Sequence, residues 1–220
     1  MRTDLRTLFI TGTDTGVGKT LCSALLCAHL AKKGKTVYIK AVQTGDVLDA
    51  EFIQSVCGDS VPVFCTTHLK LPASPHLAAA EEGTKVQVSE VVDKISGIAT
   101  KESPDFLVVE GAGGISVPFN DTENMVDLCK AINAEPIVVT RSGLGTLNHT
   151  FLTLNYAQSC GLEASVIISG CHENPDRVEE DNLDQIKQMS SDRVIGYVPF
   201  YEGADTEEIQ FSGEIPEFDI

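Results

Sequence analysis

Short apolar runs alternate with longer stretches of helical pattern along the chain. Apolar runs of this length predict buried strands, and the periodic or breaker-free stretches between them predict helices. The predicted strands are residues 8–10, 37–39, 106–109, 137–139, 166–168 and 194–198, and residues 61–64 are compatible with a short one. The predicted helices are residues 21–33, about 49–56, an alanine-rich stretch after 76, 88–101, a segment ending near 159, and 181–189. Repeated strand-then-helix units predict an α/β fold with a mostly parallel sheet and helices on both faces.

Length and charge limit the number of domains and the kinds of partner that the chain can have. The chain has 220 residues, which suits a single domain over residues 1–220, with an acidic tail at 203–220. The formal net charge is −16 and the pI about 4.6. Because phosphate backbones and anionic lipids attract the opposite charge, we expect neither a nucleic-acid nor a membrane partner. Any phosphate-binding site in this acidic chain must therefore gather basic side chains locally.

The cysteines and the termini bear on the compartment. Seven cysteines occur without a Cys-x-x-Cys pair or a zinc-like spacing. We expect most of them to be reduced, buried thiols. The N-terminus carries charges before a short apolar run, and no later run has a membrane-spanning length. We therefore expect a cytoplasmic protein.

A glycine-rich segment joins the first predicted strand to the first predicted helix. It reads Thr-Gly-Thr-Asp-Thr-Gly-Val-Gly-Lys-Thr over residues 11–20, a variant phosphate-binding loop with five residues between Gly12 and Gly18. Such a loop turns successive backbone N–H groups into one concavity at a helix N-terminus, Lys19 reaches the terminal phosphates, and Thr20 offers a hydroxyl to Mg²⁺. The candidate nucleotide-binding residues are Thr13, Asp14, Thr15, Gly16, Val17, Gly18, Lys19 and Thr20.

Two further charged residues follow predicted strands. Lys40 comes directly after strand 37–39, and Glu110 closes strand 106–109 before Gly-Ala-Gly-Gly. Carboxyl ends of parallel strands meet at one edge of a sheet, so both side chains are expected near the phosphate-binding loop. A strand-ending carboxylate beside a triphosphate is typical of a Mg²⁺ ligand.

Several motifs together resemble the dethiobiotin synthetase family of the P-loop NTPase superfamily. The motifs are residues 11–20, Lys-Ala-Val-Gln-Thr-Gly at 40–45, Ser-Pro-His at 74–76, Val-Glu-Gly-Ala-Gly-Gly at 109–114 and Gly-Leu-Gly-Thr-Leu-Asn-His at 143–149. They occur in the family's order and span residues 8 to about 150. The last third of the chain matches only in general pattern.

The resemblance implies a homodimeric ligase that uses ATP and Mg²⁺ to close a ring on 7,8-diaminopelargonate with CO₂. A substrate amine takes up CO₂ as a carbamate, the carbamate attacks the γ-phosphate, and the second amine closes the mixed anhydride. Each step places negative charge on oxygen atoms, so cations and N–H donors matter more than a strong base.

The resemblance also implies roles for individual residues. Lys40, Lys19 and Thr15 are the expected catalytic residues, with Lys40 on the carbamate and Lys19 on the β- and γ-phosphates. Thr20, Asp49 and Glu110 are the expected Mg²⁺ ligands, although Asp46 competes with Asp49 for that role. The expected substrate-binding residues are Thr15, Lys40, Thr44, Ser74 and, from the neighbouring subunit, Gly143, Leu144, Gly145, Thr146 and Asn148. Thr44 is equally well explained as a turn-capping residue. His76 and His149 are expected to be structural.

This chain departs from the family's pattern at two places. Gly16 stands where many members carry an acidic residue. Ser-Gly-Cys at 169–171 stands where better-known members carry an adenine-reading asparagine. We therefore expect backbone groups near 198–200, with Gly170 and Pro199, to bind the base, and other nucleoside triphosphates to be accepted besides ATP.

Three alternatives stay open at this point. A nucleotide-switch ATPase of the partitioning type carries a second lysine five positions before Lys19, where this chain has Asp14. A cobyrinate-type amidotransferase needs a glutaminase domain, for which this length leaves no room, although a partner chain could supply one. A nucleotide-binding protein without catalysis requires Lys40 and Glu110 to lie away from the phosphates.

Overall fold

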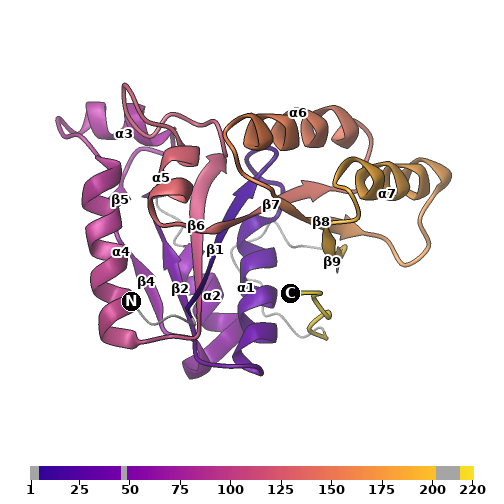
Figure 1. Ribbon diagram of the computed structural model, residues 1–220, viewed down its shortest axis with the longest axis horizontal. Coiled ribbons are helices and arrows are strands. Elements are labelled where there is room, and N and C mark those ends of the chain that lie inside the picture. Colours follow the sequence, from indigo (N-terminus) through magenta and orange to yellow (C-terminus); the bar gives the residue numbers. More distant parts are fainter. Residues whose placement is uncertain (1–4, 46–48, 202–213) are drawn as a thin grey trace.

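A seven-stranded parallel sheet forms the centre of the molecule (Figure 1). The computed structural model describes residues 5–45, 49–201 and 214–220. The strand order is β4-β2-β6-β1-β7-β8-β9, and every pair of neighbours is parallel. The strands are β1 Arg6–Gly12, β2 Thr36–Lys40, β4 Val63–Cys65, β6 Phe106–Gly114, β7 Glu135–Arg141, β8 Ser165–Cys171 and β9 Val194–Pro199. The predicted fold class is confirmed.

Helices cover both faces of this sheet. They are α1 Lys19–Ala31, α2 Asp49–Cys57, α3 Pro75–Glu81, α4 Val88–Glu102, α5 Met125–Ala131, α6 Thr146–Ser159 and α7 Arg177–Met189, with a 3₁₀ turn at Gly58–Ser60. Alternate residues of each strand point to opposite faces. One set packs with α1 and α2, and the other packs with the remaining helices. Because both faces of the sheet are buried, its strands contain continuous apolar runs.

Tyr38 and Lys40 on β2 face the same side as Val108 and Glu110 on β6 because each pair is two residues apart. This is the α1 side of the sheet, where Tyr38 belongs to the apolar core together with residues of α1. The alternation therefore delivers an ammonium and a carboxylate to the same side, next to the start of α1.

Several elements differ from the sequence-based prediction. Helix α5 was not predicted, although Asn124 and Asp127 form a capping box at its start. Helix α7 begins at Arg177 and not at 181, because the Asp176 side chain accepts a hydrogen bond from the backbone N–H of Glu179 and caps the helix. Strand β6 continues past Glu110 to Gly114, since its glycines remain paired alongside β1.

A second, two-stranded parallel sheet stands apart from the main one. Its strands are β3 Gln43–Thr44 and β5 His68–Leu69, neither of which was predicted. The sheet links the end of β2 to the turn before α3. Among the described residues, no helix is long and apolar enough to cross a membrane.

Candidate functional site

The loop between β1 and α1 curls back over its own lysine. A Cβ atom on Gly12 would lie 2.8 Å from the backbone oxygen of Asp14 and 3.2 Å from Nζ of Lys19. Gly18 has φ 92°, and a Cβ there would lie 2.6 Å from Oγ of Ser169 on β8. Both positions therefore require glycine. The ammonium of Lys19 donates to the backbone oxygen of Asp14 at 3.1 Å, inside the concavity, where a phosphate would offer it a charged acceptor.

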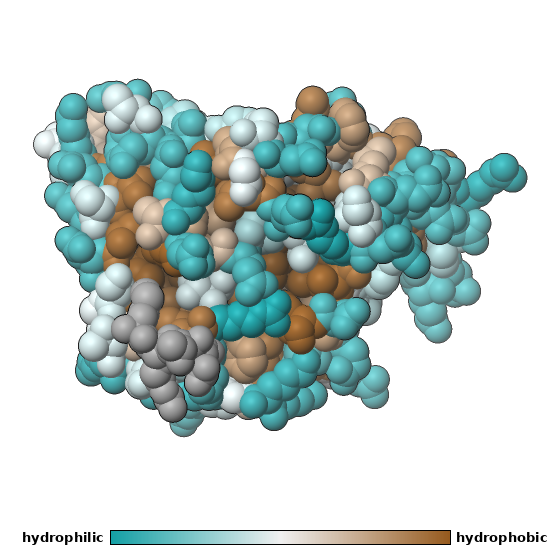
Figure 2. All heavy atoms as spheres, viewed as in Figure 1, coloured by the Kyte–Doolittle hydropathy of each residue, from teal (hydrophilic) through white to brown (hydrophobic). Residues whose placement is uncertain are grey.

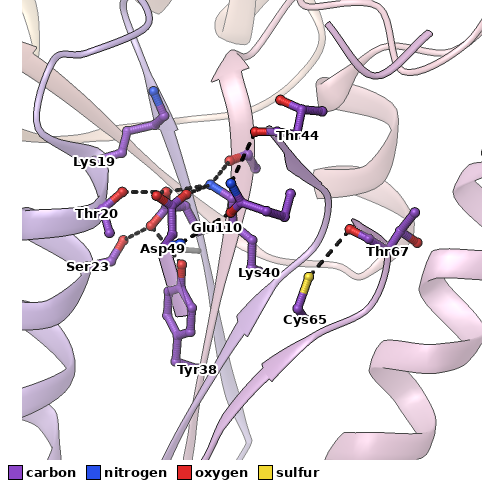
Figure 3. A network of polar contacts seen from close by, with 12 residues as sticks. Lys19, Thr20, Ser23, Tyr38, Lys40, Thr44, Asp49, Cys65, Thr67 and Glu110 are labelled. Atoms are coloured by element: carbon purple, nitrogen blue, oxygen red, sulfur yellow. Dashed lines mark hydrogen bonds and ion pairs between the residues drawn. The ribbon is translucent and has the colours of Figure 1, made fainter. Parts of the chain in front are cut away.

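Glu110 is fully buried at the centre of a charged cluster (Figure 3). Its Oε1 accepts from Nζ of Lys40 at 2.8 Å and from Oγ1 of Thr20 at 3.3 Å. The same ammonium forms an ion pair with Asp49 and donates to the backbone oxygen of Gly111 at 3.2 Å. Two carboxylates from β6 and α2 thus share one buried cation from β2.

The charges in this cluster shift one another's pKa values. Burial acts to raise the pKa of Glu110, but Lys40, Ser23 and Lys19 hold it below its usual value. Burial acts to lower the pKa of Lys40, but Glu110 and Asp49 raise it above its usual value. Burial lowers the pKa of Lys19, which lies 8% exposed, against the attraction of Glu110. Glu110 and Lys40 are therefore held in their charged forms.

The oxygen donors of this cluster suit a hard divalent cation. Thr20, Asp49 and Glu110 supply one hydroxyl and two carboxylates, which Mg²⁺ prefers as ligands. The buried carboxylate of Glu110 needs a compensating cation, and Lys40 supplies it while also pairing with the partly exposed Asp49. The backbone N–H of Asp49 donates to Oε1 of Gln43 at 3.4 Å, so strand β3 holds the start of α2 beside the cluster. The competing residue, Asp46, lies outside the described residues.

The expected substrate residues fall into two groups. Thr44 lies on β3 and Ser74 occupies the N-cap position of α3 without a side-chain capping hydrogen bond. Their segments meet where a Cβ on Gly45 would touch Pro72 at 3.1 Å. Thr15 lies exposed in the glycine-rich loop. The backbone N–H of Thr15 donates to Oδ1 of the neighbouring Asp14 at 2.7 Å.

The segment 143–148 forms the second group at the far end of β7. Gly145 has φ 91° and precedes α6, and Gly143, Leu144, Gly145 and Asn148 are exposed. Thr146 is buried and its Oγ1 bonds that of Thr140 at 2.7 Å, so its side chain anchors the helix and only its backbone can serve a ligand. His149 and His76 are both exposed.

The expected base-binding residues lie at the ends of β8 and β9. Gly170 precedes Cys171, which pairs with Pro199 on the neighbouring strand. Ser169, within the stretch 169–171 where an adenine-reading asparagine was expected, touches the glycine-rich loop and is buried. Beyond it, the rings of His172 and Phe200 stack with centroids 4.9 Å apart, and Nδ1 of His172 lies 2.8 Å from Oε2 of Glu179.

Comparisons with known proteins show the family to which this chain belongs. A family model described as an AAA domain matches residues 6–208. ATP-dependent dethiobiotin synthetase BioD of Methanocaldococcus jannaschii is 36% identical over 198 residues, covering 87% of this chain and 92% of the relative. The chain belongs to the dethiobiotin synthetase family. Another member, from Bacillus cereus, is 37% identical over 212 residues, covering 91% of this chain and 86% of its own.

Solved structures of more distant proteins share the fold of this dethiobiotin synthetase family member. A putative plasmid partition protein from Borrelia burgdorferi, bound to AMPPNP, has a TM-score of 0.64 at 11% identity and covers 97% of this chain and 94% of its own. A ParA family ATPase from Chlorobium tepidum has a TM-score of 0.57 at 14% identity, covering 91% and 86%. At this identity the likeness concerns the fold alone.

Three residues of the site escaped the sequence analysis. Oγ of Ser23 and the hydroxyl of Tyr38 donate to Oε2 of Glu110. The guanidinium of Arg141 donates to the backbone oxygens of Thr15 and Gly16 at 3.3 and 3.4 Å. A signal existed for the first two: Ser23 lies one helical turn after Lys19, and Tyr38 lies two residues before Lys40 on the same strand face.

Proposed function

We propose that this chain catalyses the ATP-dependent formation of dethiobiotin from 7,8-diaminopelargonate and CO₂. The observation that carries the proposal is the meeting of Lys19, Lys40 and Glu110 at one edge of the sheet, in a chain of the dethiobiotin synthetase family. A triphosphate on the glycine-rich loop would place its γ-phosphate beside both ammonium groups.

The chemistry proceeds in three bond-forming steps. One substrate amine attacks CO₂ and loses a proton, which forms a carbamate. A carbamate oxygen attacks the γ-phosphorus while the bond to ADP breaks, which forms a carbamic-phosphoric anhydride. The second amine attacks the anhydride carbon, phosphate leaves, and the ureido ring closes. Lys40 would stabilise the carbamate and the transferred phosphoryl group, Lys19 would stabilise the β- and γ-phosphates, and the exposed Thr15 would contact the substrate.

Mg²⁺ is part of the proposal. When bound, it would neutralise charge on the β- and γ-phosphate oxygens. Thr20, Asp49 and Glu110 would hold it, which requires Lys40 to turn away from their carboxylates and toward the substrate. The ion pairs of the buried Lys40 ammonium with both carboxylates support a cation at this position.

A homodimer would complete the substrate site. Leu144 is 91% exposed, and Phe151 and Leu152 on α6 are 52% and 58% exposed. Figure 2 shows hydrophobic atoms at the surface over α6. Apolar side chains grouped in this way are typical of a protein interface. Burying them against a second copy would bring the partner's backbone N–H groups at the start of α6 toward the substrate carboxylate.

We also propose that the base is weakly discriminated and that the protein is cytoplasmic. Ser169 is buried against the glycine-rich loop, and residues 169–171 at the end of β8 carry a hydroxyl, a glycine and a thiol in place of an amide side chain. Turnover with ATP, CTP and GTP at subsaturating concentrations should differ little, and a preference for ATP by orders of magnitude would contradict this. The seven cysteines, all of them described, are free thiols, which suits a reducing compartment.

The decisive experiment supplies 7,8-diaminopelargonate, bicarbonate, ATP and Mg²⁺ and detects dethiobiotin by mass spectrometry. We expect a product that requires all four components, with one phosphate released for each ring closed. ATP hydrolysis that is insensitive to 7,8-diaminopelargonate would instead support a nucleotide-switch ATPase.

A further inference from the structure

Each of the two carboxylate oxygens of Glu110 accepts two hydrogen bonds (Figure 3). On Oε2, Oγ of Ser23 donates at 2.7 Å and the hydroxyl of Tyr38 at 3.0 Å. On Oε1, the donors are the ammonium of Lys40 and the hydroxyl of Thr20. The Oε2 donors have no other role in the proposed reaction, whereas the Oε1 donors are the proposed carbamate-binding lysine and a proposed Mg²⁺ ligand.

The two Oε2 donors are fixed by the structure around them. Ser23 and Tyr38 have no exposed surface, and the ring of Tyr38 is packed in the core between β2 and α1. An ionised carboxylate oxygen offers about two acceptor sites, so these hydroxyls fill the capacity of Oε2. Only Oε1 faces groups that can move, because Lys40 can exchange partners and Thr20 lies at the partly exposed start of α1.

We propose that Tyr38 and Ser23 are positioning residues that restrict Glu110 to one ligating oxygen, Oε1, and so make the site select Mg²⁺ over Ca²⁺. The inference rests on the proposed Mg²⁺ site. Mg²⁺ demands near-octahedral geometry with few protein ligands, whereas Ca²⁺ takes six to eight oxygens and accepts a bidentate carboxylate. A carboxylate whose second oxygen is already satisfied in the core cannot chelate the larger ion. Without the two hydroxyls, Oε2 would be free to join Oε1 on a metal.

The test measures metal binding without turnover. The full chain is incubated with ADP and Mn²⁺, bound Mn²⁺ is measured by electron paramagnetic resonance against a protein-free Mn²⁺–ADP solution, and Mg²⁺ or Ca²⁺ is added as competitor. The variants are Tyr38→Phe, Ser23→Ala and the double variant. Tyr197→Phe, which removes a hydroxyl from an exposed ring on β9, is the matched control.

We expect Mg²⁺ to compete roughly tenfold less well in the double variant, while Ca²⁺ competes as well as or better than in the wild type. Each single variant should show part of this shift, and Tyr197→Phe should show none. An unchanged Mg²⁺ to Ca²⁺ ratio would overturn the inference, as would an equal loss of affinity for both ions, which indicates general loosening. If wild-type protein adds no bound Mn²⁺, the proposed metal site fails as well, and formation of dethiobiotin then decides separately whether the ligase assignment stands.

Discussion

The charged cluster around Glu110 and the segment around Leu144 are opposite kinds of site on one sheet edge. The cluster is buried, and each of its charged groups has a partner within the chain: Lys40 is 4% exposed and Glu110 has no exposed surface. The segment 143–152 instead presents apolar side chains to solvent, with Leu144 91% exposed. The phosphoryl-transfer half of the proposed site is thus built within a single chain, whereas the half that receives the substrate tail needs a second surface.

The largest effect is expected from the buried cation. Lys40→Gln should reduce dethiobiotin formation about 10²–10³-fold, because it removes a charged donor from developing negative charge. Product would be measured by mass spectrometry and folding by circular dichroism. Because the change leaves Glu110 and Asp49 without their cation, the double variant Lys40→Gln/Glu110→Gln serves as a second test. It should regain stability without regaining activity, and full activity in Lys40→Gln would remove this residue from the mechanism.

The exposed half can be tested by mixing variants. Asn148→Ala should weaken binding of the substrate tail in the site of the other subunit, and Lys40→Gln should inactivate its own. In a dimer with shared sites, one hybrid site contains neither change. At a substrate concentration too low to saturate Asn148→Ala, mixing the two impaired proteins should therefore restore about a quarter of wild-type turnover after subunit exchange.

The mixture of Asn148→Ala and Lys40→Gln should gain no activity if one chain builds the whole site.

Phe151→Glu should turn the dimer into a monomer in sedimentation velocity, because it places charge in the apolar surface of α6. Val178→Glu is the matched control, since Val178 is 47% exposed but lies on α7. A monomeric wild-type protein with full activity would contradict the dimer.

The smallest effect is expected in the pH dependence of stability. The pKa of Glu110 is lowered in the folded state, so its contribution is present above the unfolded value of about 4.3 and is lost as the pH falls through the folded value. The difference in free energy of unfolding between wild type and Glu110→Gln should thus shrink as the pH falls from 7 toward 3. Urea titrations would measure it, with the exposed Glu90→Gln as the matched variant. A difference that stays constant over this range would show that the charge of Glu110 does not stabilise the fold.

Local patterns were sufficient to predict the strands, the parallel sheet and the glycine-rich loop. Buried strands between helices must be apolar on both faces, and a loop that wraps a lysine needs glycine where a Cβ would collide, as at Gly12. Both requirements concern residues that are close together in the sequence. Helix α5 and the sheet of β3 and β5 were missed because they are short and depend on contacts with distant segments.

The sequence by itself determined the family, the fold class, the position of Lys19 at the start of α1 and that of Lys40 at the end of β2, because each depends on order along the chain. Glu110 was expected to close its strand, but it lies inside β6, which runs on to Gly114. Only the tertiary structure decided how these charges meet. Ser23, Tyr38 and Glu110 are separated by up to 87 residues, yet two hydroxyls share one carboxylate oxygen. Such a contact depends on strand register and on the helix packed across it, and no local pattern records either.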